Sequence, residues 1–98
     1  MTGYSIAQTA LEDPDEIDNF VAAENPAAAQ RIANAIFDAF DTLAERPGIG
    51  HRRTDLTKRA VRFWTVMSRY MIAYREGPDG IEIVRVLGPG RDVATALR

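Results

Sequence analysis

Residues 60–92 read AVRFWTVMSRYMIAYREGPDGIEIVRVLGPGRD, and this stretch decides the fold. Three runs rich in Val, Ile, Tyr, Phe and Trp are separated by two turn signals, MSR and GPDG. This pattern is typical of a three-stranded antiparallel meander. In the third run, alternation predicts Ile81 and Ile83 on one face of the sheet and Val84 and Val86 on the other. Because a strand that is apolar on both faces is usually covered on both, we expect this strand in the centre of the sheet.

Two helices are predicted before the meander. Asp13-Pro14 opens the first, since Asp can cap a helix and Pro suits its first turn. Asn25-Pro26 interrupts that helix and opens the second by the same logic. The second helix has a wide apolar stripe over about twenty residues and ends at 46–48, Arg-Pro-Gly. The side chains that we expect to pack on the sheet are Ile17, Phe20, Ile32, Ile36, Phe37 and Phe40.

With 4–9 as a first strand, the predicted order of elements is β-α-α-β-β-β. Helices joined by so short a link fold back as a hairpin or meet at a steep angle. We therefore predict an α+β fold of two layers, in which a helical hairpin packs on one face of an antiparallel sheet. At this length the whole chain, 1–98, forms a single domain.

Composition excludes several classes of protein. There is no cysteine, which rules out disulfides and thiolate metal sites and suits a reducing compartment. The N-terminus lacks a basic region followed by an apolar one, so no signal peptide is expected. No apolar run approaches the roughly 20 residues that cross a bilayer. We expect a cytoplasmic protein that has no membrane partner and needs no metal or cofactor.

The net charge of −2 is unevenly distributed. Residues 1–45 hold one basic and nine acidic residues (−8), whereas 46–98 hold eleven basic and five acidic ones (+6). Such asymmetry indicates either that the basic half meets an acidic or polyanionic partner, or that the two halves pair with each other within the fold. The sequence leaves both interpretations open.

In this order, the segments resemble the ParE/RelE toxin family of bacterial type II toxin–antitoxin modules. The resemblance rests on NPAAAQRIANAI at 25–36, LAERPGIG at 43–50, the hairpin RFWTV…YMIAYRE, and the closing IEIVRVLGPGRD. It implies one of two activities. RelE-like members cut mRNA on the ribosome without a metal, whereas ParE-like members inhibit DNA gyrase by binding to it. Both are neutralised by an antitoxin whose C-terminal segment wraps the toxin, so a toxin–antitoxin hetero-oligomer is expected.

Metal-free RNA cleavage needs an acid, a base and cations around the phosphate. RelE-like toxins often have Arg after the strand aromatic, where this chain has Met71, and a Tyr or His near the C-terminus, which the tail VATALR lacks. His51, the sole histidine, precedes the meander in a loop among arginines, where a solvated surface role is the ordinary one. We therefore predict no catalytic residue and favour the ParE-like function. The alternatives are a RelE-like, ribosome-dependent mRNA endonuclease and a non-toxic relative that only binds an antitoxin.

Four residues are candidates for binding the target: Arg62, Arg69, Arg91 and Trp64. For these arginines and for Arg85, the ordinary alternative is an ion pair with Glu82, Asp92 or the acidic helices. Trp64 shares a predicted strand face with Arg62. If the helices leave that face open, Trp64 belongs to an exposed apolar patch of the kind that partners bind; otherwise it is a core residue. The antitoxin-binding residues are not predictable from the sequence.

Overall fold

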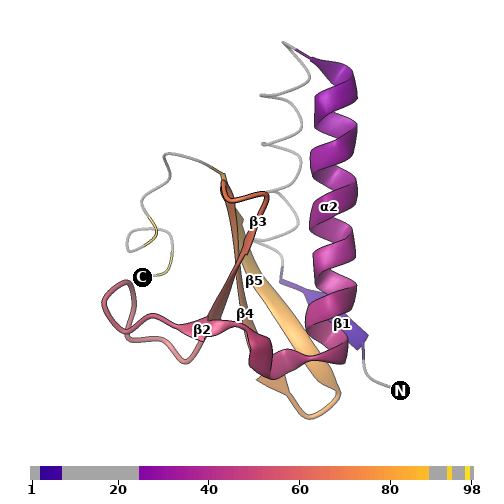
Figure 1. The fold of residues 1–98 in the computed structure, drawn as a ribbon. Helices are drawn as coiled ribbons and strands as arrows, with labels where there is room; N and C mark the ends of the chain where they lie inside the picture. Colours follow the sequence, from indigo (N-terminus) through magenta and orange to yellow (C-terminus); the bar gives the residue numbers. More distant parts are fainter. Residues whose placement is uncertain (1–2, 8–24, 89–92, 94–96, 98) are drawn as a thin grey trace.

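The computed structural model describes residues 3–7, 25–88, 93 and 97. One long helix, α2 (Pro26–Glu45), lies on one face of a five-stranded sheet (Figure 1). The strands are β1 (Gly3–Ile6), β2 (His51–Arg52), β3 (Arg62–Val66), β4 (Tyr70–Gly77) and β5 (Gly80–Leu87), and a short 3-10 helix, η1 (Pro47–Ile49), follows α2. This is the predicted two-layer α+β fold. The first predicted helix, with Asp13-Pro14, Ile17 and Phe20, lies outside the described residues.

Helix α2 begins where the sequence predicts. The side chain of Asn25 accepts a hydrogen bond of 3.1 Å from the backbone N–H of Ala28, and Pro26 occupies the first turn. This cap satisfies one of the N–H groups that have no partner within the helix. At the other end, the N–H of Arg46 donates to the carbonyl of Thr42, and the chain then turns through η1.

The prediction that Phe37 belongs to the core is wrong. Its side chain is 44 % exposed, whereas Ile36 and Phe40 are buried. An α-helix turns about 100° per residue, so Phe37 points away from the stripe through Ile36, Phe40 and Leu43 that faces the sheet. The apolar pattern is wider than the surface that the sheet covers. Phe37 instead packs edge-to-face on Phe40, with ring centroids 5.5 Å apart.

The sheet order is β1-β5-β4-β3-β2. The meander β3–β4–β5 is antiparallel as predicted, and β5 lies inside the sheet as predicted. The prediction of a wholly antiparallel sheet is wrong at β1, which pairs in parallel with β5. A parallel neighbour requires a long crossover, which the chain between β1 and β5 supplies. At this seam Gly80 has φ 131° and faces Gly3, and a side chain at position 80 would collide with the Gly3 backbone.

A β-bulge in β5 changes which residues face the helix. Ala73 pairs with Arg85 but Tyr74 pairs with Ile83, so Val84 is an extra residue. Val86 therefore lies with Ile83 in the core under α2, while Val84 lies on the opposite face. The predicted pairing of Val84 and Val86 on one face is wrong, because a bulge interrupts the alternation of two.

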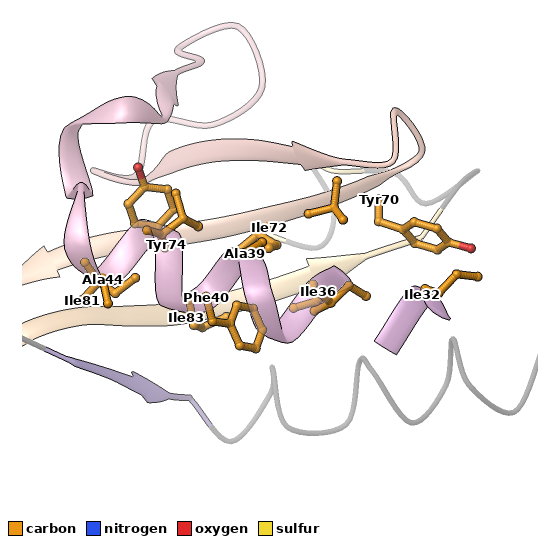
Figure 2. Packing of buried hydrophobic residues seen from close by; sticks show 13 residues of the cluster. Ile32, Ile36, Ala39, Phe40, Ala44, Tyr70, Ile72, Tyr74, Ile81 and Ile83 are labelled. Carbon is orange, nitrogen blue, oxygen red and sulfur yellow. The ribbon is translucent and has the colours of Figure 1, made fainter. Parts of the chain in front are cut away.

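Buried side chains cover both faces of the meander. The helix-side core joins α2 to the sheet, and Figure 2 shows Phe40 of the helix and Ile83 of the sheet within it. On the other face, a second core is formed by Val61, Phe63, Ala73, Val84 and Leu97, with Leu56, Met71 and Val93 packed against it. The sheet is therefore covered on both sides, as the apolar third run predicts.

Candidate functional site

A buried tyrosine fixes the junction between the helix and the sheet edge. The Tyr74 hydroxyl donates to the carbonyl of Pro47 (2.6 Å) and accepts from the N–H of Gly50 (2.9 Å). Arg62 Nη1 donates to the carbonyl of Gly50 at 3.1 Å. Burial raises the pKa of Tyr74, and the hydrogen bond from Gly50 and the charge of Arg62 oppose this shift. These contacts hold η1 and the start of β2 against the meander.

Strand β2 pairs with only two of the five residues of β3. His51 pairs with Phe63, and Arg52 pairs with Arg62. Within the part of the chain that the structure describes, no strand pairs with Trp64–Val66 on that side, which we call the β3 edge. The edge ends at a turn in which Met67 and Ser68 have φ of 55° and 57°. Unpaired backbone groups of this kind can receive a strand from another chain.

The structure places three of the four predicted target-binding residues on β3 or in the turn that follows it. Arg62 and Trp64 lie on β3, and Arg69 is exposed in the turn that follows. Arg62 is half-buried and holds Gly50, so part of its role is structural. Arg91 lies outside the described residues. The sequence predicts the strand that carries Arg62 and Trp64, but it does not reveal that Arg62 bonds to Gly50.

Trp64 lies on the face of the sheet that α2 covers. It is half-buried and packs against the helix-side core. The sequence leaves open whether Trp64 lies in an exposed patch or in the core. The structure places it on the face that the helix covers. Trp64 belongs to the strand whose outer side is open, and its side chain keeps part of its surface exposed.

The charges on β5 have different environments. Glu82 forms an ion pair of 2.7 Å with Arg75 of β4, across the strand pair. Arg75 is a partner that the sequence reasoning does not name, although cross-strand neighbours of opposite charge are the natural partners in a sheet. Arg85 is half-buried and faces Ala73 in the ladder.

His51 is exposed on the edge strand β2. No described carboxylate forms an ion pair with it, and no group of three or more His, Cys, Asp or Glu within the described residues could hold a metal. An exposed imidazole without an orienting partner is the arrangement of an ordinary surface histidine. The described helices contain no segment long and apolar enough to cross a bilayer.

A family model described as the ParE toxin of type II toxin-antitoxin system, parDE, matches residues 4–93. The chain belongs to this family of ParE toxins. The match spans the helix, the β3 edge and the whole meander, and it confirms the resemblance read from the sequence.

A solved structure entitled "Chromosomal ParDE TA system from P. aeruginosa" has the same ParE fold. Its TM-score is 0.76 at 20 % sequence identity, and the match covers 91 % of this chain and 97 % of that one. At this identity the likeness concerns the fold. No curated protein matches the chain.

The structure also presents a surface of this ParE family member that the site predictions omit. Residues 51–59, HRRTDLTKR, form an exposed and strongly basic segment that includes β2. We call this segment the basic loop. The sequence signal for it, a run of cations in a turn-rich stretch, is visible but is equally typical of a solvated surface.

Proposed function

We propose that this protein is a toxin that inhibits DNA gyrase by binding to it and that a ParD-like antitoxin neutralises it. The observation that carries the proposal is the match of the ParE toxin family model over residues 4–93. Target binding uses the β3 edge with Trp64 as the aromatic anchor, together with the cations Arg62, Arg69 and Arg91. Aromatic and arginine side chains are the residues that most often dominate the binding free energy of protein interfaces.

The disposition of polar groups favours binding over RNA cleavage. A general base must lie within hydrogen-bond reach of the proton that it removes and is usually oriented by a third group. His51 stands exposed on β2, and the position after Tyr70 is Met71, half-buried beside the second core. The hydroxyl of Tyr74 is engaged with Gly50 and Pro47 inside the fold. The environments of His51, Met71 and Tyr74 therefore favour a protein that acts by binding to its target.

The antitoxin, in this proposal, covers the same edge. An extended segment added beside Trp64–Val66 would complete the ladder that β2 leaves unfinished. Acidic side chains in that segment would meet Arg69 at the turn, which favours fast association. Target and antitoxin then compete for one surface, which accounts for neutralisation without a second site.

Purified protein should inhibit DNA supercoiling by gyrase, and prior addition of the antitoxin should abolish the inhibition. Expression without the antitoxin should induce the response to DNA damage before translation stops. His51→Ala should leave both effects intact, since no role is assigned to the imidazole. If ribosomes and message incubated with the protein yield cuts phased by codon, and His51→Ala abolishes them, the endonuclease function replaces this proposal.

A further inference from the structure

The basic loop carries cations that form no ion pair with any described carboxylate. Arg53 is engaged, because its guanidinium forms two hydrogen bonds, of 2.9 and 2.7 Å, with the carboxylate of Asp55. The hydrogen bonds of that pair raise the pKa of Arg53 and lower the pKa of Asp55, and the opposite charges act in the same directions. Arg52, Lys58 and Arg59 are exposed, and no carboxylate in the described ranges forms an ion pair with any of them.

The loop is held in place by its own hydrogen bonds. The N–H groups of Leu56 and Thr57 both donate to the carbonyl of Arg53, and the Thr57 hydroxyl accepts from the N–H of Arg59. Leu56 packs against the second core. Lys58 and Arg59 thus border a shallow recess of about 380 Å³, together with Thr54 and Thr57. The cations project from a fixed turn and need little further ordering to meet a ligand.

The chemistry of this surface does not suit a protein partner. Protein interfaces derive most of their free energy from buried apolar anchors. In the described chain, the exposed large hydrophobic side chains are Tyr4, Phe37 and Met67, and none of them belongs to the basic loop. Apart from Leu56 and the Asp55 carboxylate, which Arg53 engages, the loop offers cations and hydroxyl groups, which are the usual contacts to phosphate oxygens.

The same surface lacks the means to bind single strands. Proteins that hold single-stranded nucleic acid stack its bases on exposed aromatic rings. No aromatic residue occurs among residues 51–59 other than the imidazole of His51. A duplex presents its phosphates outward and needs no stacking platform. Figure 1 places the loop between β2 and β3 on the side of the molecule away from α2, whose exposed face carries Asp38 and Asp41.

We infer that the basic loop binds the phosphate backbone of double-stranded DNA without regard to sequence, through Arg52, Lys58 and Arg59. The choice of DNA rests on the proposed function, because the proposed target handles duplex DNA and the loop would contact that duplex beside the enzyme. Three phosphate contacts predict that the logarithm of the binding constant falls with the logarithm of the salt concentration with a slope of about −2.7. Between about 50 and 200 mM salt, binding should weaken by roughly 40-fold.

The test uses the full-length protein without gyrase and a fluorescent duplex of about 30 base pairs, with fluorescence anisotropy as the readout. Lys58→Gln with Arg59→Gln should weaken binding at least tenfold at low salt and make the slope less steep by about 2. The matched control removes two exposed arginines from the helix layer, Arg31→Gln with Arg46→Gln. The control should bind the duplex nearly as the unaltered protein does, although it has the same net charge as the loop variant.

Thermal melting by circular dichroism verifies that both variants are folded. Equal losses in the loop variant and the control would overturn the inference, because net charge alone would then explain binding. Tighter binding to a single strand of the same length would overturn it too, as would a loop variant that loses antitoxin affinity while keeping DNA affinity. The DNA-binding assay contains no gyrase and so tests this inference separately from the proposed function. A protein that binds the duplex but does not inhibit supercoiling by gyrase would contradict only the proposed function.

Discussion

The phenolic oxygen of Tyr74 lies 2.9 Å from the backbone nitrogen of Gly50, whose N–H donates to it. The two residues are so close that a Cβ at position 50 would collide with the tyrosine ring. Glycine is therefore required here for space, since its φ of −72° is open to any residue. This contact, with the bond from the hydroxyl to Pro47, couples the end of α2 to the meander and sets where β2 can pair with β3.

Tyr74→Phe should destabilise the fold by about 1–3 kcal/mol, because the Gly50 N–H and the Pro47 carbonyl both lose their buried partner. The measurement is urea denaturation followed by circular dichroism. Tyr70→Phe is the matched control, since Tyr70 is also buried and its hydroxyl bonds to no described residue. The control should change the free energy of unfolding by less than about 0.5 kcal/mol. Equal stability of the two variants would contradict the structural role of the Tyr74 hydroxyl.

The same hydroxyl predicts a loss of stability in alkali. Burial raises the pKa of Tyr74 above its ordinary value of 10.0, so the folded protein keeps a proton that the unfolded chain releases. With fewer protons bound in the unfolded state, the free energy of unfolding falls as pH rises above about 10. Denaturation midpoints between pH 8 and 11, roughly, should show this decline in the unaltered protein. The decline should be smaller in Tyr74→Phe, and parallel curves would contradict the assignment to this residue.

Phe37 and Phe40 offer a matched pair in one helix. Phe40→Ala should cost about 3–5 kcal/mol, because it leaves a cavity in the helix-side core. Phe37→Ala should cost about 1 kcal/mol, since the ring is 44 % exposed and loses mainly its edge contact with Phe40. Chemical denaturation measures both. If Phe37→Ala costs as much as Phe40→Ala, the ring has a buried environment that its exposure does not show.

The sequence predicts those parts of the fold that depend on local chemistry. The cap at Asn25 and the strands of the meander follow from residue type and spacing. The periodicity of apolar residues does not show how much of the helix surface the sheet covers, and Phe37 lies outside the covered part. The alternation of apolar residues does not show the extra residue in β5. The parallel pairing of β1 with β5 joins distant parts of the chain and has no local signal.

The candidate site is predictable to a similar degree. The sequence places Arg62, Trp64 and Arg69 on one strand and its turn because the meander is predictable. It does not show that β2 stops after two residues and leaves the β3 edge open, since this depends on the Tyr74 junction. Nor does it show that Arg53 pairs with Asp55 while Lys58 and Arg59 pair with no carboxylate of the described residues.

The last prediction concerns electrostatic steering of the antitoxin. Arg69→Glu with Arg91→Glu should slow association roughly tenfold at low salt and flatten its salt dependence, because both reverse charges of the basic half and Arg69 lies in the turn beside the proposed docking edge. Arg62 is left unaltered, since its guanidinium also holds the Gly50 carbonyl and its loss would disturb the fold. Stopped-flow mixing with a labelled antitoxin at low and high salt measures the rates.

The control for this experiment reverses the same number of charges on the helix layer, Arg31→Glu with Arg46→Glu. Its association rate should stay within about twofold of the unaltered protein, because neither arginine belongs to the docking edge or its turn and salt screens exposed charges that are not adjacent. The two ion pairs formed among the described residues, Arg53–Asp55 and Arg75–Glu82, both lie within 46–98 and do not join the acidic half to the basic half. If the Arg69/Arg91 variant associates as fast as the unaltered protein at low salt, the basic half is not the steering surface. The uneven charge would then reflect pairing between the two halves within the fold.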